Sequence, residues 1–457
     1  MSKHSFLDRS LFSVQTSTHS IHLSKIFLPM YLETFFNCTL GTINTAIISR
    51  VSETAVGAIG ASNQLIVMYT SLLSVIVMGA TAVVSNYLGG SRLKEAHSAS
   101  AVAIVFASVV SALFGLILAL LRQPILVLMH IDESLLHLSM TYYGLRTLFL
   151  VIPTVTSMLN ALMHCHGITR PAVYSGLISN IVNLTGSFLS VTLLRKNMQA
   201  VICGISISCI LGQAGALLCS FLLFRRHKIT VSFPNSLRIW LHHISTMLKI
   251  GVPGGMSTMG FTISQTVSTS FIGSLGPVFL SAKVYFSTVT FYCCMFSSSL
   301  GNANSVLVGY LCGSRNYSRA IALCAQLTRI TSASNLLLSC LLLLFRRPIL
   351  ALFTTQEEIL SMALIVFSID ILVEQARAVS QIYEYALRST GDTFFSMVGI
   401  LASCWINGVG VAYLLGIRLG LGLPGIWIGF ALDETCRALV TYGRWRSGKW
   451  IEKNQLI

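Results

Sequence analysis

Long runs of apolar residues, separated by short polar segments, extend over the whole chain. The runs are continuous and do not alternate between apolar and polar positions, so they predict helices and exclude the strands of about 10 residues that build membrane barrels. An apolar helix of about 20 residues crosses a bilayer. The pattern therefore predicts an all-α polytopic membrane protein. Its twelve expected transmembrane helices cover residues 26–48, 57–86, 99–121, 138–162, 172–194, 200–224, 247–273, 281–310, 321–345, 360–386, 394–416 and 424–443.

The composition agrees with this pattern. Of the 457 residues, 54% are hydrophobic and only 10% are charged, whereas a soluble protein carries about 25% charged residues. These values exclude a disordered chain and a soluble enzyme with a polar surface. The first apolar run is too long for the core of a signal peptide and is not followed by a small-residue cleavage site, so we expect it to be retained.

The net charge of +15, from 30 Lys+Arg and 15 Asp+Glu, is a signal of topology. Most basic residues fall in segments that lie on one side of the predicted spans, including the ends of the chain and residues 225–246. Positively charged loops stay in the cytoplasm. We expect a multi-pass protein of the inner (plasma) membrane, with cytoplasmic tails at 1–25 and 444–457. Because no charged module stands apart from the apolar runs, nucleic-acid binding is not expected.

The chain contains an internal repeat. The segment Tyr87–Arg92 recurs as Tyr310–Arg315, and Arg122–Leu126 recurs as Arg346–Leu350, with a displacement of about 224 positions. Further matches share this displacement: Pro29 with Pro253, Ala96 with Ala320, Gly167 with Gly391 and Asn183 with Asn407.

The repeat predicts two six-helix halves, 26–224 and 247–443, joined by a cytoplasmic linker at 225–246. Since six is an even number, both halves insert in the same direction, and their pseudo-two-fold axis runs along the membrane normal. One half can then rock against the other around a central site, which favours transport. Pro29 and Pro253 lie in the first helix of each half, where proline kinks a helix and provides a bending point.

Three polar residues interrupt the first span: Glu33, Asn37 and Asn44. Glu33 and Asn37 are four positions apart and share one face of a helix. Glu33 lies about 12 Å deeper than Lys25 at 1.5 Å per residue. A carboxylate at this depth is either a functional group that faces a cavity or a partner in a structural hydrogen bond, and the sequence favours neither.

The tenth span carries five polar residues on one stripe: Asp370, Glu374, Arg377, Gln381 and Glu384. Charges that face lipid are costly, so the stripe should face a cavity or another helix. One interpretation is a self-neutralising ladder in which Asp370 and Glu374 both reach Arg377. The other is a proton or cation relay that Arg377 modulates. We favour the ladder, with Glu384 as the residue that remains unpaired.

Other polar residues within spans suggest contacts between helices. Amide side chains hydrogen-bond across transmembrane helices, and this role is expected of Asn180, Asn183 and Asn407. All three are also candidates for lining a cavity, as are Asn37, Asn44, Arg377 and Gln381. In the twelfth span, Asp433 and Glu434 with Arg437 predict a local cluster of ions.

Several motifs, in order along nearly the whole chain, resemble those of the multidrug and toxic compound extrusion (MATE) family. The resemblance is carried by Leu28-Pro29, Val56–Gly60, Gly79–Ala82, Gly89-Gly90, Ala386–Asp392 and Gly422–Gly429. It implies a twelve-helix antiporter that exports organic cations and other amphipathic compounds in exchange for Na⁺ or H⁺.

The carboxylates that couple ions in this family do not carry over. The matching positions hold Asn44, Ser187, Phe261 and Arg377. Asparagine and arginine cannot exchange a proton near neutral pH. Either another carboxylate couples the ion, or the protein is uncoupled or has another role. The candidates for coupling are Glu33, Glu374 and Glu384.

We therefore expect a secondary active transporter that works by alternating access. It should exchange small organic cations or amphipathic molecules for H⁺ or Na⁺, and it should be monomeric. The alternative is a lipid-linked glycan flippase of the related superfamily, which would use a basic cavity for pyrophosphate. Arg146, Lys283 and Arg377 could supply its charge. The chain lacks the H-E-x-x-H and G-x-S-x-G motifs, so we expect neither an enzyme nor a cofactor.

Overall fold

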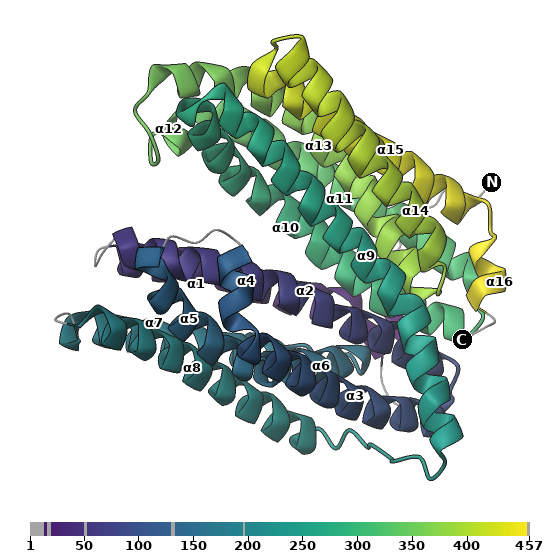
Figure 1. The fold of residues 1–457 in the computed structure, drawn as a ribbon. Coiled ribbons are helices and arrows are strands. Elements are labelled where there is room, and N and C mark those ends of the chain that lie inside the picture. The colour runs from purple at the N-terminus through teal and green to yellow at the C-terminus, as the bar shows by residue number, and fades with distance from the viewer. Residues whose placement is uncertain (1–12, 16–19, 50–52, 129–132, 195–196, 455–457) are drawn as a thin grey trace. The chain divides into compact units, whose positions relative to one another are not determined.

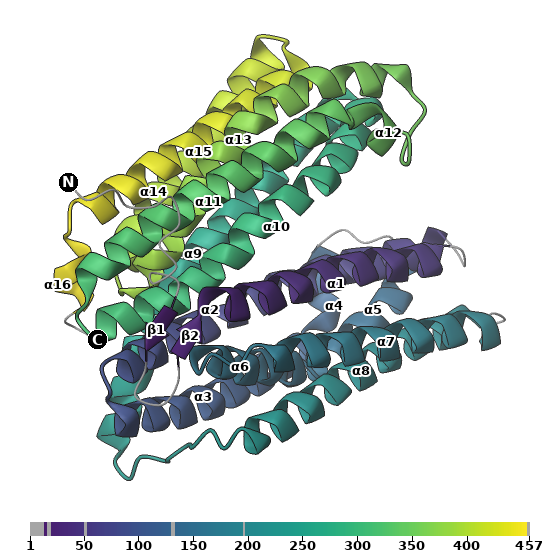
Figure 2. The ribbon, with the colours of Figure 1, turned by 180° about the vertical axis from the view of Figure 1, so that it is seen from behind.

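The computed structural model describes residues 13–15, 20–49, 53–128, 133–194 and 197–454, and they are almost entirely helical (Figure 1). The first half contains α1 Leu23–Ser49, α2 Glu53–Gly89, α3 Leu93–Leu120, α4 Arg122–Leu128, α5 Glu133–Leu148, α6 Val151–Cys165, α7 Arg170–Leu193 and α8 Met198–Arg226. The second contains α9 Leu237–Leu275, α10 Pro277–Gly313, α11 Tyr317–Leu344, α12 Arg346–Leu350, α13 Glu357–Ser389, α14 Thr393–Ser403, the π-helices η2 Cys404–Val411 and η3 Leu414–Arg418, α15 Gly422–Arg446 and α16 Trp450–Asn454. Before α1, the short strands β1 Ser13–Gln15 and β2 Ser20–His22 pair antiparallel (Figure 2).

The observed helices confirm the predicted all-α membrane fold. In the part of the chain that the structure describes, eight helices are long and apolar enough to cross a membrane, and the pair Leu136–Leu148 and Val151–Cys165, bent by 41°, makes a ninth. The remaining predicted spans correspond to α1, α9 and α15, in which polar and charged residues interrupt the apolar run. The eleventh span is one continuous path through α14, η2 and η3.

The chain forms two compact units. The N unit consists of Leu28–Val84 and Arg92–Gly251, and the C unit consists of Met1–Phe27, Ser85–Ser91 and Val252–Ile457. In the N unit, α7 packs along α8, and α6 contacts both α3 and α8. In the C unit, α13 packs against α10, α11 and α15. The predicted linker begins at the end of α8, but its last part is already helical because α9 starts at Leu237.

The internal repeat is visible in the backbone. Ser91 and Arg315, which lie 224 positions apart in the turns that follow α2 and α10, both have a positive φ, 57° and 59°. Gly167 and Gly391 likewise end α6 and α13 with φ of 74° and 82°, the left-handed conformation that glycine adopts after a helix. Equivalent positions of the two halves thus end their helices in the same way.

The repeated Tyr-Leu-x-Gly motifs pack directly on each other within the C unit. A Cβ atom placed on Gly89 would lie 2.2 Å from the carbonyl oxygen of Tyr310, and one on Gly313 would lie 2.0 Å from that of Asn86. The end of α2 and the end of α10 therefore meet backbone to backbone. Small residues permit such close approach between membrane helices.

This contact predicts the effect of adding one methyl group. Gly313→Ala should destabilise the protein by about 1–3 kcal/mol, since the backbone of α2 would have to move. Gly443→Ala is the matched control, because a Cβ at that position of α15 meets nothing within 4 Å. Thermal unfolding in detergent measures both variants. Equal melting temperatures for the two would contradict the close packing.

Candidate functional site

The N unit contains a polar cavity of about 210 Å³. Four membrane helices contribute to its wall: α1, α6, α7 and α8. The lining residues are Glu33, Asn37, Pro153, Thr156, Ser157, Asn160, Ser175, Gly176, Ser179, Gln213 and Ala216. Hydroxyl and amide groups dominate this wall, so the cavity is polar although the helices around it are mainly apolar.

Glu33 is the one ionisable residue among those that line the N-unit cavity. It shares the cavity-facing side of α1 with Asn37, as their spacing predicts. Gly176 of α7 lies across from them, where an added Cβ would be in ordinary van der Waals contact with Asn37 Oδ1, at 3.5 Å. Within the described chain, Glu33 has no ion pair and no hydrogen bond. Its carboxylate therefore stands alone in a neutral polar setting.

Hydrogen bonds between neighbouring helices hold the cavity wall in place. Asn180 Nδ2 donates to Asn37 Oδ1 at 2.7 Å, which ties α7 to α1. Deeper in the wall, Asn160 Nδ2 donates to Ser175 Oγ at 3.2 Å, and Ser220 Oγ donates to Asn160 Oδ1 at 2.9 Å. The expected bond between helices is thus present for Asn180.

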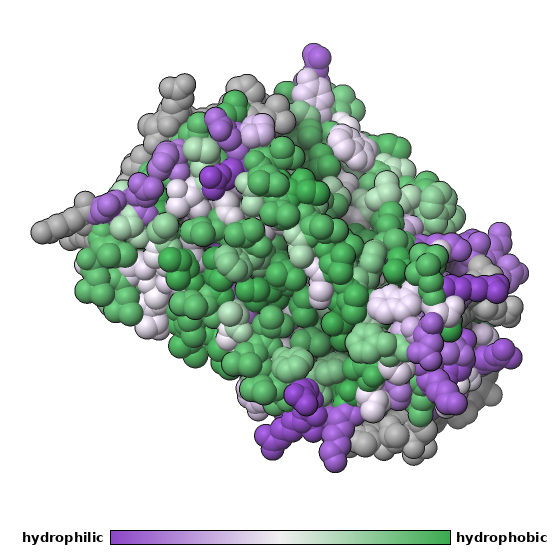
Figure 3. Space-filling model, turned by 60° about the horizontal axis from the view of Figure 1, so that its bottom comes forward, coloured by the Kyte–Doolittle hydropathy of each residue, from purple (hydrophilic) through white to green (hydrophobic). Residues whose placement is uncertain are grey.

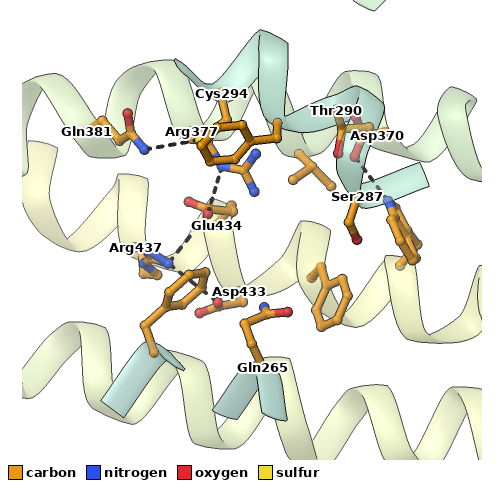
Figure 4. A pocket seen from close by; sticks show the side chains of 15 residues that line it. Gln265, Ser287, Thr290, Cys294, Asp370, Arg377, Gln381, Asp433, Glu434 and Arg437 are labelled. Carbon is orange, nitrogen blue, oxygen red and sulfur yellow. Dashed lines mark hydrogen bonds and ion pairs between the residues drawn. The ribbon is translucent and has the colours of Figure 1, made fainter. Parts of the chain in front are cut away.

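The C unit contains a second cavity, of about 310 Å³, between α9, α10, α13 and α15 (Figure 4). Aromatic side chains form part of the wall, and charged and amide groups form the rest. The lining residues are Phe261, Gln265, Ser287, Thr290, Phe291, Cys294, Asp370, Val373, Arg377, Gln381, Trp427, Phe430, Asp433, Glu434 and Arg437.

A chain of ion pairs runs along one side of the C-unit cavity. Arg377 contacts Glu374 of its own helix, and its Nε donates to Glu434 Oε1 of α15 at 3.1 Å. Arg437 Nη1 lies 3.4 Å from Glu434 Oε1 and 3.7 Å from Asp433 Oδ2. The predicted pair of Glu374 with Arg377 and the predicted ion cluster of α15 are both confirmed. Figure 4 shows Arg377, Glu434 and Arg437 in a row.

Asp370 does not join this chain, so its predicted pairing with Arg377 is wrong. Asp370 lies two helical turns before Arg377, and its Oδ1 accepts a hydrogen bond from Trp427 Nε1 at 3.0 Å. Its Oδ2 is buried and has no hydrogen-bond partner in the described chain. Figure 4 shows Asp370 apart from the arginines, near Ser287 and Thr290. One carboxylate of the C-unit cavity is therefore only partly satisfied.

The expectation that Glu384 remains unpaired is also wrong. Glu384 forms an ion pair with Arg388, four positions later. The predicted span ended at residue 386 and placed Arg388 in the loop, whereas α13 continues to Ser389 and brings the two side chains onto one face. Neither Glu384 nor Glu374 lines the C-unit cavity.

The remaining candidates are distributed over several helices. Gln381 lines the C-unit cavity and contacts Cys294 Sγ through its Nε2 at 3.7 Å. Asn183 accepts from Ser187 at 3.3 Å, and Asn407 donates to Ser403 at 3.4 Å. Within the described chain these side chains therefore bond to their own spans, and the expected bonds between helices are not found for them. Pro29 and Pro253 lie inside α1 and α9. The side chain of Asn44 lies outside the described residues.

Some lining residues were not predicted. Asn160 and Gln213 face the N-unit cavity, and Gln265 and Trp427 face the C-unit cavity. Asn160 and Gln213 are single amides within apolar runs. Such an amide indicates a polar contact between membrane helices, so the sequence could have identified both residues. Trp427 carries no such signal, because its contact with Asp370 depends on how α13 packs against α15.

Comparison with known proteins identifies the relatives of this chain. A model of the MatE family matches residues 29–189 and 253–414, one segment in each half. The uncharacterized transporter YisQ of Bacillus subtilis is 26% identical over 93% of this chain and 94% of its own length. A probable multidrug resistance protein NorM of Thermotoga maritima is 24% identical, over 95% of this chain and 94% of its own.

Solved structures show the same fold. A mutant of the MATE transporter VcmN of Vibrio cholerae superposes with a TM-score of 0.85. The superposition covers 94% of this chain and 98% of VcmN, at 16% identity.

Proposed function

Because the chain belongs to the MatE family and is a multi-pass transporter, we propose that it is a cation-coupled antiporter. It exports drugs, organic cations or other amphipathic metabolites by alternating access, in exchange for H⁺ or Na⁺. It resides in the inner (plasma) membrane with both termini in the cytoplasm, as the distribution of its basic residues favours.

One observation carries this proposal: Glu33 is an ionisable group in a polar cavity, and it forms no ion pair with any described residue. An isolated carboxylate in such a place is costly unless a proton or a cation neutralises it. Asn37 and the hydroxyls of the wall offer oxygen ligands beside it. A site of this kind can exchange a coupling ion for a substrate, which is the step that an antiporter needs.

The C-unit cavity supports a cationic substrate. The residues that line it include three carboxylates, Asp370, Asp433 and Glu434, against two guanidinium groups, Arg377 and Arg437. The excess of negative charge favours a cation. Aromatic rings in the same wall can stack on an organic cation through their faces. We propose that the substrate binds here and that Asp370, with its partly satisfied carboxylate, faces the substrate.

The same charges disfavour the flippase alternative. A pyrophosphate group requires basic residues that are free to bind it, whereas both arginines of the C-unit cavity are already paired with acids. Arg146 contacts Cys209, and Lys283 donates to Thr269. Neither of them lines one of the two polar cavities.

Transport into proteoliposomes tests the proposal. Ethidium, an organic cation, should accumulate when an opposing H⁺ or Na⁺ gradient is imposed across membranes that contain the protein. Without a gradient, the internal concentration should only equilibrate with the medium. Absence of accumulation under either gradient would contradict coupled antiport, and movement of a lipid-linked glycan in the same vesicles would favour the flippase.

A further inference from the structure

The N unit also has an apolar groove of about 620 Å³ that the proposed transport cycle does not use. Ile104 of α3, Val155 of α6 and Leu218 and Phe221 of α8 form its walls. Arg225, at the end of α8, is the one charged residue among those that line it. The groove is therefore apolar along its length and cationic at one end. A space-filling view shows how largely apolar one face of the protein is (Figure 3).

The charged end of the groove is fixed in place. Arg225 lies over the ring of Phe221, with its Cζ 5.9 Å from the ring centroid. Lys228 has a φ of 52°, and Val231, three residues later, lines the groove. Thr230 Oγ1 contacts His97 Nε2 of α3 at 2.7 Å and holds this segment against the helix.

The positive charge at this end is not neutralised. Arg225, Arg226 and Lys228 are exposed, and none of them forms an ion pair in the described chain. No Asp or Glu occurs in the sequence between Glu133 and Glu357. These cations are thus available for an anion from outside the protein.

The walls of the groove belong to helices that are long and apolar enough to cross a membrane. Both α3 and α8 are membrane-spanning helices, and Leu218 and Phe221 are 58% and 46% exposed. From Ala214 to Arg225 the groove follows α8 for about 16 Å at 1.5 Å per residue. One leaflet of a bilayer core measures about 15 Å, half of roughly 30 Å. The groove therefore has the length of one leaflet's acyl chains.

We propose that this groove binds one acyl chain of an anionic glycerophospholipid, with the lipid phosphate on Arg225. The apolar walls accept the chain, and Arg226 and Lys228 add to the attraction for the head group. An organic cation would meet the unpaired charge of Arg225, and a free phosphate ion would leave the apolar walls unused. The inference depends on the membrane location of the protein and not on antiport, so either can fail alone.

Native mass spectrometry of the delipidated full-length protein tests the head-group contact. Phosphatidylglycerol should bind at least about fivefold more tightly than phosphatidylcholine with the same acyl chains, and Arg225→Gln should abolish that preference. Arg238→Gln, at an exposed cation outside the groove, is the matched control and should keep it. Equal binding of both lipids by the wild type would overturn the proposal. Displacement of phosphatidylglycerol by inorganic phosphate or by ethidium would overturn it in favour of an ion site or a substrate site.

A second measurement locates the acyl chain. Phosphatidylglycerol with brominated acyl chains, at one lipid per protein in detergent, should quench the fluorescence of the tryptophan introduced by Leu218→Trp. The tryptophan introduced by Leu193→Trp, at a 76% exposed position of α7 outside the groove, should not be quenched. Equal quenching at the two positions would contradict binding in the groove.

Discussion

Glu33→Gln is expected to abolish gradient-driven accumulation of an organic cation. We expect accumulation to decrease by at least about tenfold, an effect within the range of coupling free energies between linked sites. Glutamine keeps the shape and polarity of the side chain but carries no negative charge that a proton or Na⁺ could neutralise. Exchange of labelled for unlabelled substrate, which requires no net ion movement, should persist. The test measures two quantities in the same proteoliposomes: ethidium uptake under an imposed gradient, which should be lost, and equilibrium exchange, which should remain.

The matched control for this variant is Glu95→Gln. Glu95 is half exposed at the start of α3, where it pairs with Arg92 at 3.2 Å. Its replacement should leave both uptake and exchange unchanged, because exposed ion pairs contribute little. If Glu33→Gln accumulates ethidium as the wild type does, Glu33 is not the coupling residue. Asp370, the partly satisfied carboxylate of the C-unit cavity, would then be the next candidate.

Arg377→Met should destabilise the protein by about 3–5 kcal/mol, the usual effect of leaving one partner of a buried ion pair without the other. The side chain of Glu374 is fully buried, and its remaining partner in the described chain is the amide of Asn335. Glu434 would be less affected, since it keeps Arg437 and accepts a hydrogen bond from Ser380. Thermal or denaturant unfolding in detergent measures the loss.

A second substitution separates charge from packing in this experiment. Adding Glu374→Gln to Arg377→Met removes the unpaired charge and should recover most of the lost stability. Arg347→Met, at an exposed position of α12, is the control for loss of an arginine and should have little effect. If the double variant is as unstable as Arg377→Met alone, the ion pair is not the cause.

Much of the fold was predictable because the bilayer restricts the possible structures. A continuous apolar run can only be a helix in the membrane, and each predicted run coincides with one or more helices of the described chain. The repeat at about 224 positions is also visible in the turns after α2 and α10, where Ser91 and Arg315 both have a positive φ. The end of α13 was less predictable, since a helix that leaves the membrane can continue through polar residues such as Arg388. That short continuation decided the partner of Glu384.

The candidate site was predictable only within single helices. The four-residue spacing of Glu33 and Asn37 placed both in one cavity, and the spacing of Glu374 and Arg377 identified an ion pair. Between helices, the sequence predicted that Asn180 makes a hydrogen bond, but it did not identify Asn37 as the partner. Trp427 binds Asp370 and Glu434 binds Arg377 because α15 packs along α13, and no periodicity in one helix encodes the register of its neighbour.

The most direct test of coupled antiport through Glu33 is the movement of the coupling ion itself. Proteoliposomes that contain the wild type and enclose a pH indicator, or radioactive Na⁺ in a parallel set, are exposed to ethidium. We predict that ethidium entry drives H⁺ or Na⁺ in the opposite direction in the wild type and in Glu95→Gln, and that Glu33→Gln shows no such ion movement. Ethidium entry without ion movement in the wild type, or unchanged ion movement in Glu33→Gln, would contradict the account.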